Sequence, residues 1–369
     1  RCGSVFANLN EFPSLTVTHP TTEALDRLAM RSDESGLVRV LKGSVAPEHE
    51  QKVAKHPYQG RLRRLVQEAS EFGADYVYFR LYPDAGAPRA EVFIFDRTSP
   101  TAVVNNTEDS ELQLKLWNYG QVPLMFVLCR DGVDIRNLLT KPELDELGVP
   151  KLSPFERLNL AADTAAEIEQ GKWDRYNAHR FDNGTFWNKD NPLLKDAETS
   201  IKALVNEVRI ARLEVERRTE KWNNPALAKR LMIFAIMVRF LEERGILTDD
   251  YFRRANADAT RFEDIIGRPG TLANVLGKLE HDLNGDVFRL RPGVNGGPSE
   301  REQIERLKAD DLAPIADFAT GQISSGQKHL WKLYRFDHLP VEAMSYIYED
   351  FLGGEDNAYY TPQLLAELL

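Results

Sequence analysis

Residues 76–82 (YVYFRLY) and 91–95 (EVFIF) are the part of the sequence that decides the fold. Both runs are rich in β-branched and aromatic residues, which favour strands, and the proline-containing segment 83–88 between them predicts a turn. A third strand is predicted over 122–128, followed by a hairpin turn at Asp131-Gly132 and a returning strand over 133–135. With helices predicted over 61–72 and 109–117, the order is helix, two strands, helix, two strands. The sequence therefore predicts a small α/β unit over residues 58–150.

This order also suits a restriction nuclease core, in which two carboxylates on adjacent strands hold Mg²⁺ and a nearby lysine positions the attacking water. Asp75 or Asp84, followed by Glu91, has a tolerable spacing for the two carboxylates. Phe93 occupies the position of the lysine, and no lysine lies between Asp75 and Asp96. A degenerate nuclease-like core, or an unrelated recognition module, explains the unit better than an active nuclease does.

The residues before this unit carry weaker patterns. A short helix is predicted over 22–30, and 37–41 (LVRVL) is an apolar patch, so residues 1–57 are interpreted as an N-terminal arm that packs on the next domain. Arg61, Arg63 and Arg64 open the helix over 61–72, where cations oppose the helix dipole. They either face an acidic partner or, in the interpretation that we favour, form a solvated surface.

Residues 151–333 read as a helical domain. Helices are predicted over 153–170, where Ser153 and Glu156 suit a capping box, over 197–222, over 225–241, in pieces over 262–283, and from 298, where Ser299 and Glu302 form a second box. The apolar run 231–238 is broken by Arg239 and is too short to span a bilayer, so it predicts a buried core helix. Residues 196–221 hold six basic and six acidic side chains, which indicates a mixed, solvated face on the helix over 197–222 rather than a DNA-binding one.

The C-terminal residues 334–369 carry a helix and a second helix start. Pro340 suits the first turn of a helix, and Gly353-Gly354 ends it. Thr361 and Pro362 look like the cap and first residue of another helix, whose free N–H groups can hold a carboxylate. The side chains expected on the buried faces of these two helices are Val341, Met344, Ile347, Tyr348, Phe351 and Leu352, and then Leu364, Leu365, Leu368 and Leu369.

The runs 339–342 (LPVE), 347–349 (IYE) and 359–362 (YYTP) resemble the start of the catalytic domain of N6-adenine DNA methyltransferases, a family that includes type IIG restriction–modification enzymes and phage-defence methyltransferases. Looser similarity extends to 182–187 (DNGTFW), 241–245 (LEERG), 284–288 (NGDVF) and 326–327 (GQ). The resemblance implies that Tyr360, Thr361 and Pro362 help to hold the methionine end of S-adenosylmethionine. Asn357 stands where the family usually has glycine, and asparagine also tolerates a left-handed backbone.

Two later motifs of that family, a glycine-containing cofactor loop and an Asn-Pro-Pro run that holds the flipped adenine, do not occur in the sequence. The resemblance therefore implies the N-terminal part of a longer adenine-specific enzyme, in which 334–369 begin a methyltransferase domain that is absent here. The full protein would methylate the N6 of adenine in DNA after the base leaves the duplex, whereas the chain alone would not be catalytic and has no catalytic residue assigned. The alternatives are a regulatory or protein-interaction module of a defence complex and an N-terminal nuclease.

Composition limits the remaining possibilities. The 369 residues carry a formal charge of −10, which argues against a chain that coats nucleic acid through its overall field. Cys2 and Cys129 are the two cysteines, and the seven histidines show no metal-ligand spacing, so neither a disulfide framework nor a metal site is expected. We expect an α+β, predominantly helical protein in the cytoplasm, without a membrane segment. DNA and defence-system subunits are its expected partners.

Overall fold

The computed structural model describes residues 19–81, 87–99, 105–152, 155–160, 166–188, 199–283, 288–322 and 330–352, together with the single residues 101, 191 and 194. The chain divides into two compact units whose segments alternate along the sequence. The first unit contains 1–103, 126–135 and 156–188, and the second contains 104–125, 136–155 and 189–369.

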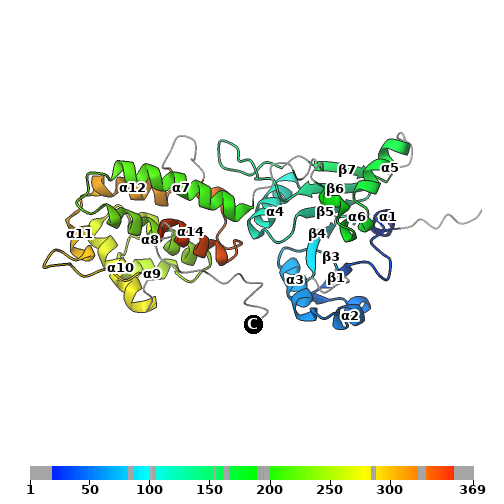
Figure 1. The fold of residues 1–369 in the computed structure, drawn as a ribbon, viewed down its shortest axis with the longest axis horizontal. Coiled ribbons are helices and arrows are strands. Elements are labelled where there is room, and N and C mark those ends of the chain that lie inside the picture. Colours follow the sequence, from blue (N-terminus) through cyan, green and yellow to red (C-terminus); the bar gives the residue numbers. More distant parts are fainter. Residues whose placement is uncertain are drawn as a thin grey trace, which may run out of the picture. The chain divides into compact units, whose positions relative to one another are not determined.

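A seven-stranded sheet forms the core of the first unit (Figure 1). The strand order is β2-β1-β3-β4-β5-β6-β7. The pairs β1–β2, β1–β3 and β3–β4 are antiparallel. The register between β3 and β4 shifts at Tyr78/Phe79, which marks a β-bulge. The strands are β1 (Leu37–Leu41), β2 (Ser44–Val45), β3 (Tyr76–Arg80), β4 (Arg89–Asp96), β5 (Leu124–Cys129), β6 (Gly132–Asn137) and β7 (Phe155–Asn159).

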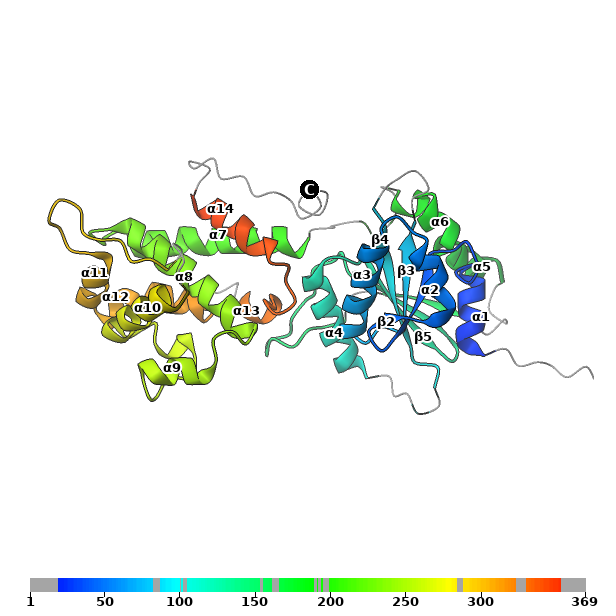
Figure 2. The ribbon, with the colours of Figure 1, turned by 90° about the horizontal axis from the view of Figure 1, so that it is seen from below.

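Helices cover both faces of this sheet, because side chains alternate along each strand. On one face Phe93 of β4, which pairs with Val77, contacts Phe72 beside α3 at a ring-centroid distance of 6.3 Å. On the other face Tyr78 contacts Phe181 of α6 at 6.0 Å. Figure 2 shows α2 and α3 in front of β3 and β4. The helical elements of this unit are α1 (Pro20–Arg27), α2 (Pro47–Ala54), α3 (Gln59–Glu71), α5 (Ala166–Arg175), α6 (Ala178–Asp182) and the 3-10 helix η1 (Thr185–Trp187).

The second unit is a helical assembly around α8, whose side chains are buried on nearly every side, as the apolar run 231–238 predicts. Helices α7, α12 and α14 pack on it. The described helical elements are α4 (Asn106–Tyr119), α7 (Ser200–Arg218), α8 (Pro225–Glu243), α9 (Asp249–Ala255), η3 (Phe262–Asp264), α10 (Pro269–Leu283), α11 (Glu300–Arg306), α12 (Ala309–Ala319), α13 (Leu330–Leu333) and α14 (Glu342–Leu352).

The mixed architecture of helices and strands is confirmed, and the strands and helices predicted between 59 and 137 lie within a few residues of their expected bounds. The capping box at the start of α11 is also confirmed, since Ser299 accepts from the Glu302 N–H and Glu302 accepts from the Ser299 N–H. None of the helices in the described ranges has the length and apolarity needed to cross a membrane.

Residues 153–170 differ from the prediction of one continuous helix. Phe155–Asn159 form β7, the last strand of the sheet, and α5 begins only at Ala166; Ser153 and Pro154 lie outside the described residues. Tertiary contacts favour the strand here. Leu158 is buried, Glu156 pairs with Arg175, and Arg157 pairs with Asp134 at 2.6 Å.

The two units also have bounds other than 57/58 and 150/151. Residues 20–54 supply α1, β1, β2 and α2 to the first unit, so this part of the expected arm belongs to the sheet. Residues 156–188, expected in the helical domain, return to the first unit, while α4 belongs to the second. In α14 the predicted face is partly correct. Met344, Ile347 and Phe351 are buried, whereas Val341 just before the helix and Tyr348 within it are 56% and 39% exposed.

Candidate functional site

The three residues expected to hold the cofactor, Tyr360, Thr361 and Pro362, lie outside the described residues, as does Asn357. The structure does describe the first part of the run that carries the resemblance, from Leu339 to Leu352, and the segment 330–338 before it. The candidate site lies in the part of the helical unit that holds these residues.

Asn118, near the C-terminal end of α4, fixes the start of the segment. Its side chain is fully buried, and its Nδ2 donates to the carbonyl oxygens of Leu114 and Leu333, both at 2.9 Å. Its Oδ1 accepts from the Arg335 N–H at 3.1 Å. One amide side chain thus satisfies backbone groups on both sides of Tyr334, whose own ring lies 5.6 Å from that of Trp117.

The C-terminal end of α8 holds the next residues. Glu243 Oε2 accepts from the Phe336 N–H at 2.8 Å, and the Arg244 guanidinium donates to the carbonyl oxygens of Phe336 and Leu339 at 3.2 and 2.7 Å. Phe336 and Leu339 are buried. The runs 241–245 and 339–342, which carry separate parts of the sequence resemblance, therefore contact each other through Arg244 and Leu339.

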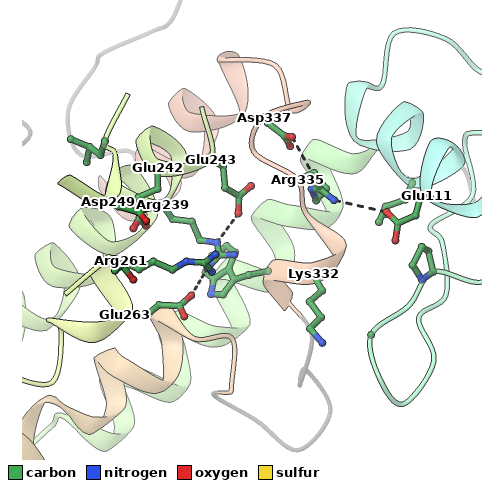
Figure 3. A pocket seen from close by; sticks show the side chains of 16 residues that line it. Glu111, Arg239, Glu242, Glu243, Asp249, Arg261, Glu263, Lys332, Arg335 and Asp337 are labelled. Atoms are coloured by element: carbon green, nitrogen blue, oxygen red, sulfur yellow. Dashed lines mark hydrogen bonds and ion pairs between the residues drawn. The ribbon is translucent and has the colours of Figure 1, made fainter. Parts of the chain in front are cut away.

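A cavity of about 530 Å³ opens beside this junction, within the second unit (Figure 3). Its walls come from α4, the segment 148–150, the end of α8, the start of α9, the segment around η3, and the α13 segment. The charged and aromatic residues that line it are Glu111, Arg239, Glu242, Glu243, Asp249, Arg261, Glu263, Trp331, Lys332, Arg335 and Asp337.

Most of these charges are matched within the wall. Arg239 contacts Glu243 at 2.9 Å and Glu263 at 2.7 Å, and its guanidinium lies over the Trp331 ring at 5.7 Å. Arg335 contacts Asp337 at 3.5 Å and Glu111 at 3.9 Å (Figure 3). The cavity is therefore lined by two separate groups of ion pairs. One joins α8 to η3, and the other joins α4 to the segment after α13.

Two adjacent carboxyls in this wall have raised pKa values. Burial raises the pKa of Glu242 to about 7, against the opposing effect of the Phe262 N–H that it accepts at 2.9 Å. Burial also raises the pKa of Glu243, which Arg239 opposes. Glu242 can exchange a proton near neutral pH, but no group of three His, Cys, Asp or Glu side chains suited to a metal ion lies among the described residues. The chemistry of the wall suits a structural junction better than a catalytic centre.

Helix α14, which leads from this junction toward the expected cofactor residues, is held by α7. Arg209 Nε donates to Asp350 Oδ1 at 2.9 Å, and Arg212 donates to the Asp350 carbonyl oxygen at 2.7 Å. The Arg212 guanidinium also lies 5.5 Å from the centre of the Phe351 ring. The interpretation of the α7 arginines as a solvated face holds for Arg209, whose side chain is 48% exposed although it pairs with Asp350. It is wrong for Arg212, whose side chain is 16% exposed, because α14, which lies more than 130 residues further along the chain, covers it.

The carboxylates of the nuclease hypothesis are not brought together in the first unit. Asp75 Oδ2 accepts from the Asp96 N–H at 2.7 Å, at the far end of β4 from Glu91. Five strand positions separate Asp96 from Glu91, which is about 16 Å. Phe93 is fully buried against Phe72, and Asp84 lies outside the described residues.

Glu91 itself has an unusual environment that the sequence pattern does not indicate. It is 1% exposed, and among the residues that the structure describes neither of its carboxyl oxygens has a hydrogen-bond partner. Burial raises its pKa to about 7, while Arg89 and Arg80 oppose the shift. The negative charge of Asp182 also raises the pKa of Glu91. The Asp182 carboxylate accepts a hydrogen bond from the Tyr78 hydroxyl at 3.0 Å. The β-bulge between β3 and β4 falls at this position, which the spacing of apolar residues alone does not reveal.

His338, one of the seven histidines, is half-buried and lies 3.5 Å from Asp337, and burial lowers its pKa. Arg63 pairs with Glu50, and Arg64 lies 3.5 Å from Glu68, so both have intramolecular partners at the surface. Cys129 is a buried free cysteine, and Cys2 lies outside the described residues.

We compared the chain with models of protein families, with curated proteins and with solved structures. No match was found in any of the three comparisons.

Proposed function

We propose that this chain is the N-terminal part of an adenine-specific DNA methyltransferase of a restriction–modification or phage-defence system. In this proposal the full protein transfers a methyl group from S-adenosylmethionine to the N6 of adenine in DNA. The observation that carries it is the sequence run from Leu339 to Pro362, which resembles the start of that catalytic domain.

The packing of the described half of this run supports the proposal. Asn118, Glu243 and Arg244 fix Leu333–Leu339 by side-chain hydrogen bonds, and Asp350 joins α14 to α7. A cofactor-binding segment needs such a rigid base, because loosely held residues do not keep a site in its productive geometry. The helical unit is then the support from which Tyr360, Thr361 and Pro362 would reach the cofactor.

Calorimetry with S-adenosylmethionine tests whether this chain supplies only part of the cofactor site. We expect the chain by itself to bind the cofactor very weakly, since the adenosine half of the pocket would be built by the domain that follows in the full protein. The full protein should bind it tightly. Micromolar affinity for the chain alone would contradict the proposal.

A protein-interaction module of a defence complex is the second candidate, and two observations favour it. The chain carries a formal charge of −10, and α7 exposes Ile210 and Leu213, which are 56% and 57% accessible. A salt titration of DNA binding separates the candidates. Binding that weakens steeply with salt indicates phosphate contacts, whereas no binding by the full protein at low salt favours the interaction module.

The nuclease alternative has less support, because Asp75 and Glu91 lie apart and Phe93 fills the lysine position. We expect no Mg²⁺-dependent cutting of plasmid DNA by the chain. Cutting that is lost in Glu91→Ala would restore this alternative.

A further inference from the structure

A second cavity lies within the first unit, away from everything that the proposed methyltransferase function uses. Its volume is about 700 Å³, and it is bounded by α1, the loop after α1, β1, α2 and the first residue of β3. Its size is in the range of pockets that take small organic molecules. Leu25, Met30, Leu37 and the ring of Tyr76 give it an apolar wall.

Lys52 of α2 supplies the main charge of this cavity. Its ammonium group is half-buried and donates to the carbonyl oxygens of Ser35 and Leu37, the second at 3.4 Å. In the described part of the chain, no carboxylate lies within the 4.0 Å of an ion pair with it, and burial lowers its pKa. Asp33 and Asp182 act on it only from a distance, by opposing that shift. A half-buried cation without an anionic partner is stabilised when an anion enters the space beside it.

The other charges around the cavity leave an excess of cations. Arg31 is paired with Asp26 at 3.1 Å, and Arg39 with Glu48 at 3.2 Å. Lys55 of α2 also lines the cavity, is exposed, and makes no ion pair in the ranges that the structure describes. Two unmatched ammonium groups therefore face one carboxylate, that of Asp33, in a chain whose overall charge is negative.

Uncharged donors stand beside these cations. Thr22 of α1, Gln51 of α2 and Tyr76 of β3 line the cavity, and within the described residues their side chains make no hydrogen bond. Phosphate oxygens accept several hydrogen bonds at once, and charge-assisted bonds from ammonium groups are the strongest of them. The volume exceeds what a lone phosphate ion fills, which leaves room for an organic part against the apolar wall.

We propose that this cavity binds a small organic phosphate, with the phosphate group beside Lys52 and Lys55 and the organic part against Leu25, Leu37 and Tyr76. The assignment is one of binding, and no bond is made or broken in it. It is independent of the methyltransferase proposal, because every residue that it uses belongs to the first unit.

Calorimetric titration of the chain with ATP, inorganic pyrophosphate and citrate tests this proposal. We expect ATP to bind saturably, pyrophosphate more weakly, and citrate, which lacks phosphate, weakest. Lys52→Met should weaken ATP binding by at least about tenfold, and added salt should weaken binding by the unaltered chain. Lys42→Met, at an exposed lysine of the same unit that does not line the cavity, should leave the affinity unchanged.

Lys55→Met and Thr22→Val are further variants, because within the described residues neither side chain makes a hydrogen bond or an ion pair. Each should weaken ATP binding by a few-fold, so the test does not rely on correct folding of Lys52→Met. The proposal is overturned if the unaltered chain binds neither ATP nor pyrophosphate. It is also overturned if Lys52→Met, Lys55→Met and Thr22→Val all bind ATP as the unaltered chain does.

Discussion

Single buried polar side chains decide how the C-terminal segment is held. Asn118 uses two hydrogen bonds to join α4 to residues 333 and 335, although more than 200 positions separate them in sequence. Nothing local in the sequence around Asn118 indicates this contact, since an asparagine near a helix end is ordinarily a capping residue.

Asn118→Ala should destabilise the chain by about 2–4 kcal/mol, because the variant leaves the Leu333 carbonyl and the Arg335 N–H buried without partners. Urea unfolding followed by circular dichroism measures this loss. Asn118→Asp is the matched control. Asn118→Asp keeps an acceptor for the Arg335 N–H but loses the donor to the Leu333 carbonyl. Its free energy of unfolding should therefore differ from that of Asn118→Ala. A change below about 0.5 kcal/mol for Asn118→Ala would mean that water replaces these bonds.

Glu91 should make the stability of the first unit depend on pH. Its pKa is raised from 4.5 in the unfolded chain to about 7 in the folded one, so between these values the folded state binds the extra proton. Stability therefore falls as pH rises from about 4.5 to 7, by a total on the order of 3 kcal/mol.

Glu91→Gln should flatten this fall, and thermal unfolding between pH 4.5 and 8 measures it. Part of the slope should persist in the variant, because the pKa of Glu242 in the second unit is raised in the same way. Glu71→Gln, at an exposed position, is the control. If the Glu91→Gln and unaltered proteins lose stability in parallel over this range, Glu91 does not carry the effect.

Thr361→Ala in the full protein should weaken S-adenosylmethionine binding while DNA binding stays intact. Loss of a helix N-cap typically costs about 0.5–2 kcal/mol, and each 1.4 kcal/mol lost at the cofactor's carboxylate raises the dissociation constant about tenfold. Calorimetry gives the constant. An unchanged cofactor affinity with a lower melting temperature would make Thr361 a structural cap only.

At the scale of elements, the contact between α7 and α14 sets how firmly the C-terminal segment is held. Asp350 has a largely buried side chain, 13% exposed, between Arg209 and Arg212. Its charge-assisted bonds are the main polar contacts of α14 with α7 in the described residues.

Asp350→Asn should therefore loosen α14 by about 1–2 kcal/mol, because the two guanidinium groups lose their anionic partner. Amide exchange over 342–352 should become roughly 5- to 30-fold faster. Glu349→Gln, on the same helix and without an ion pair in the described region, should leave exchange unchanged. Equal exchange in Asp350→Asn and in the unaltered chain would mean that the apolar face alone holds α14.

The elements show where sequence patterns suffice and where they do not. The density of β-forming residues is enough to predict three of the strands, β3, β4 and β5. The start of α8 is predicted by Pro225 and the apolar run that follows it. Ser153-Pro154 and Glu156 match the pattern of a helix start, so the sequence predicts a helix over residues 155–159. The partners that make them a strand, among them Asp134 and Arg175, lie elsewhere in the chain.

At the scale of the whole molecule, the interleaving of the two units is the feature that sequence order conceals. Helix α4 lies between strands of the sheet in sequence but belongs to the helical unit, where Asn118 and Glu111 reach the C-terminal segment. The resemblance includes 241–245 and 339–342, and in the structure these two runs contact each other. The Lys52 cavity could not be predicted, because its residues come from five separate segments.

The proposal that this chain supports the catalytic domain of an adenine-specific methyltransferase is tested most directly by methyl transfer to DNA. The full protein is incubated with DNA and S-adenosylmethionine labelled in the methyl group, and the nucleosides of the DNA are then analysed. We expect label in N6-methyladenine, and its loss in a protein that carries Thr361→Ala when the cofactor is limiting. Absence of label from the DNA, or label found only in methylated cytosine, would contradict it.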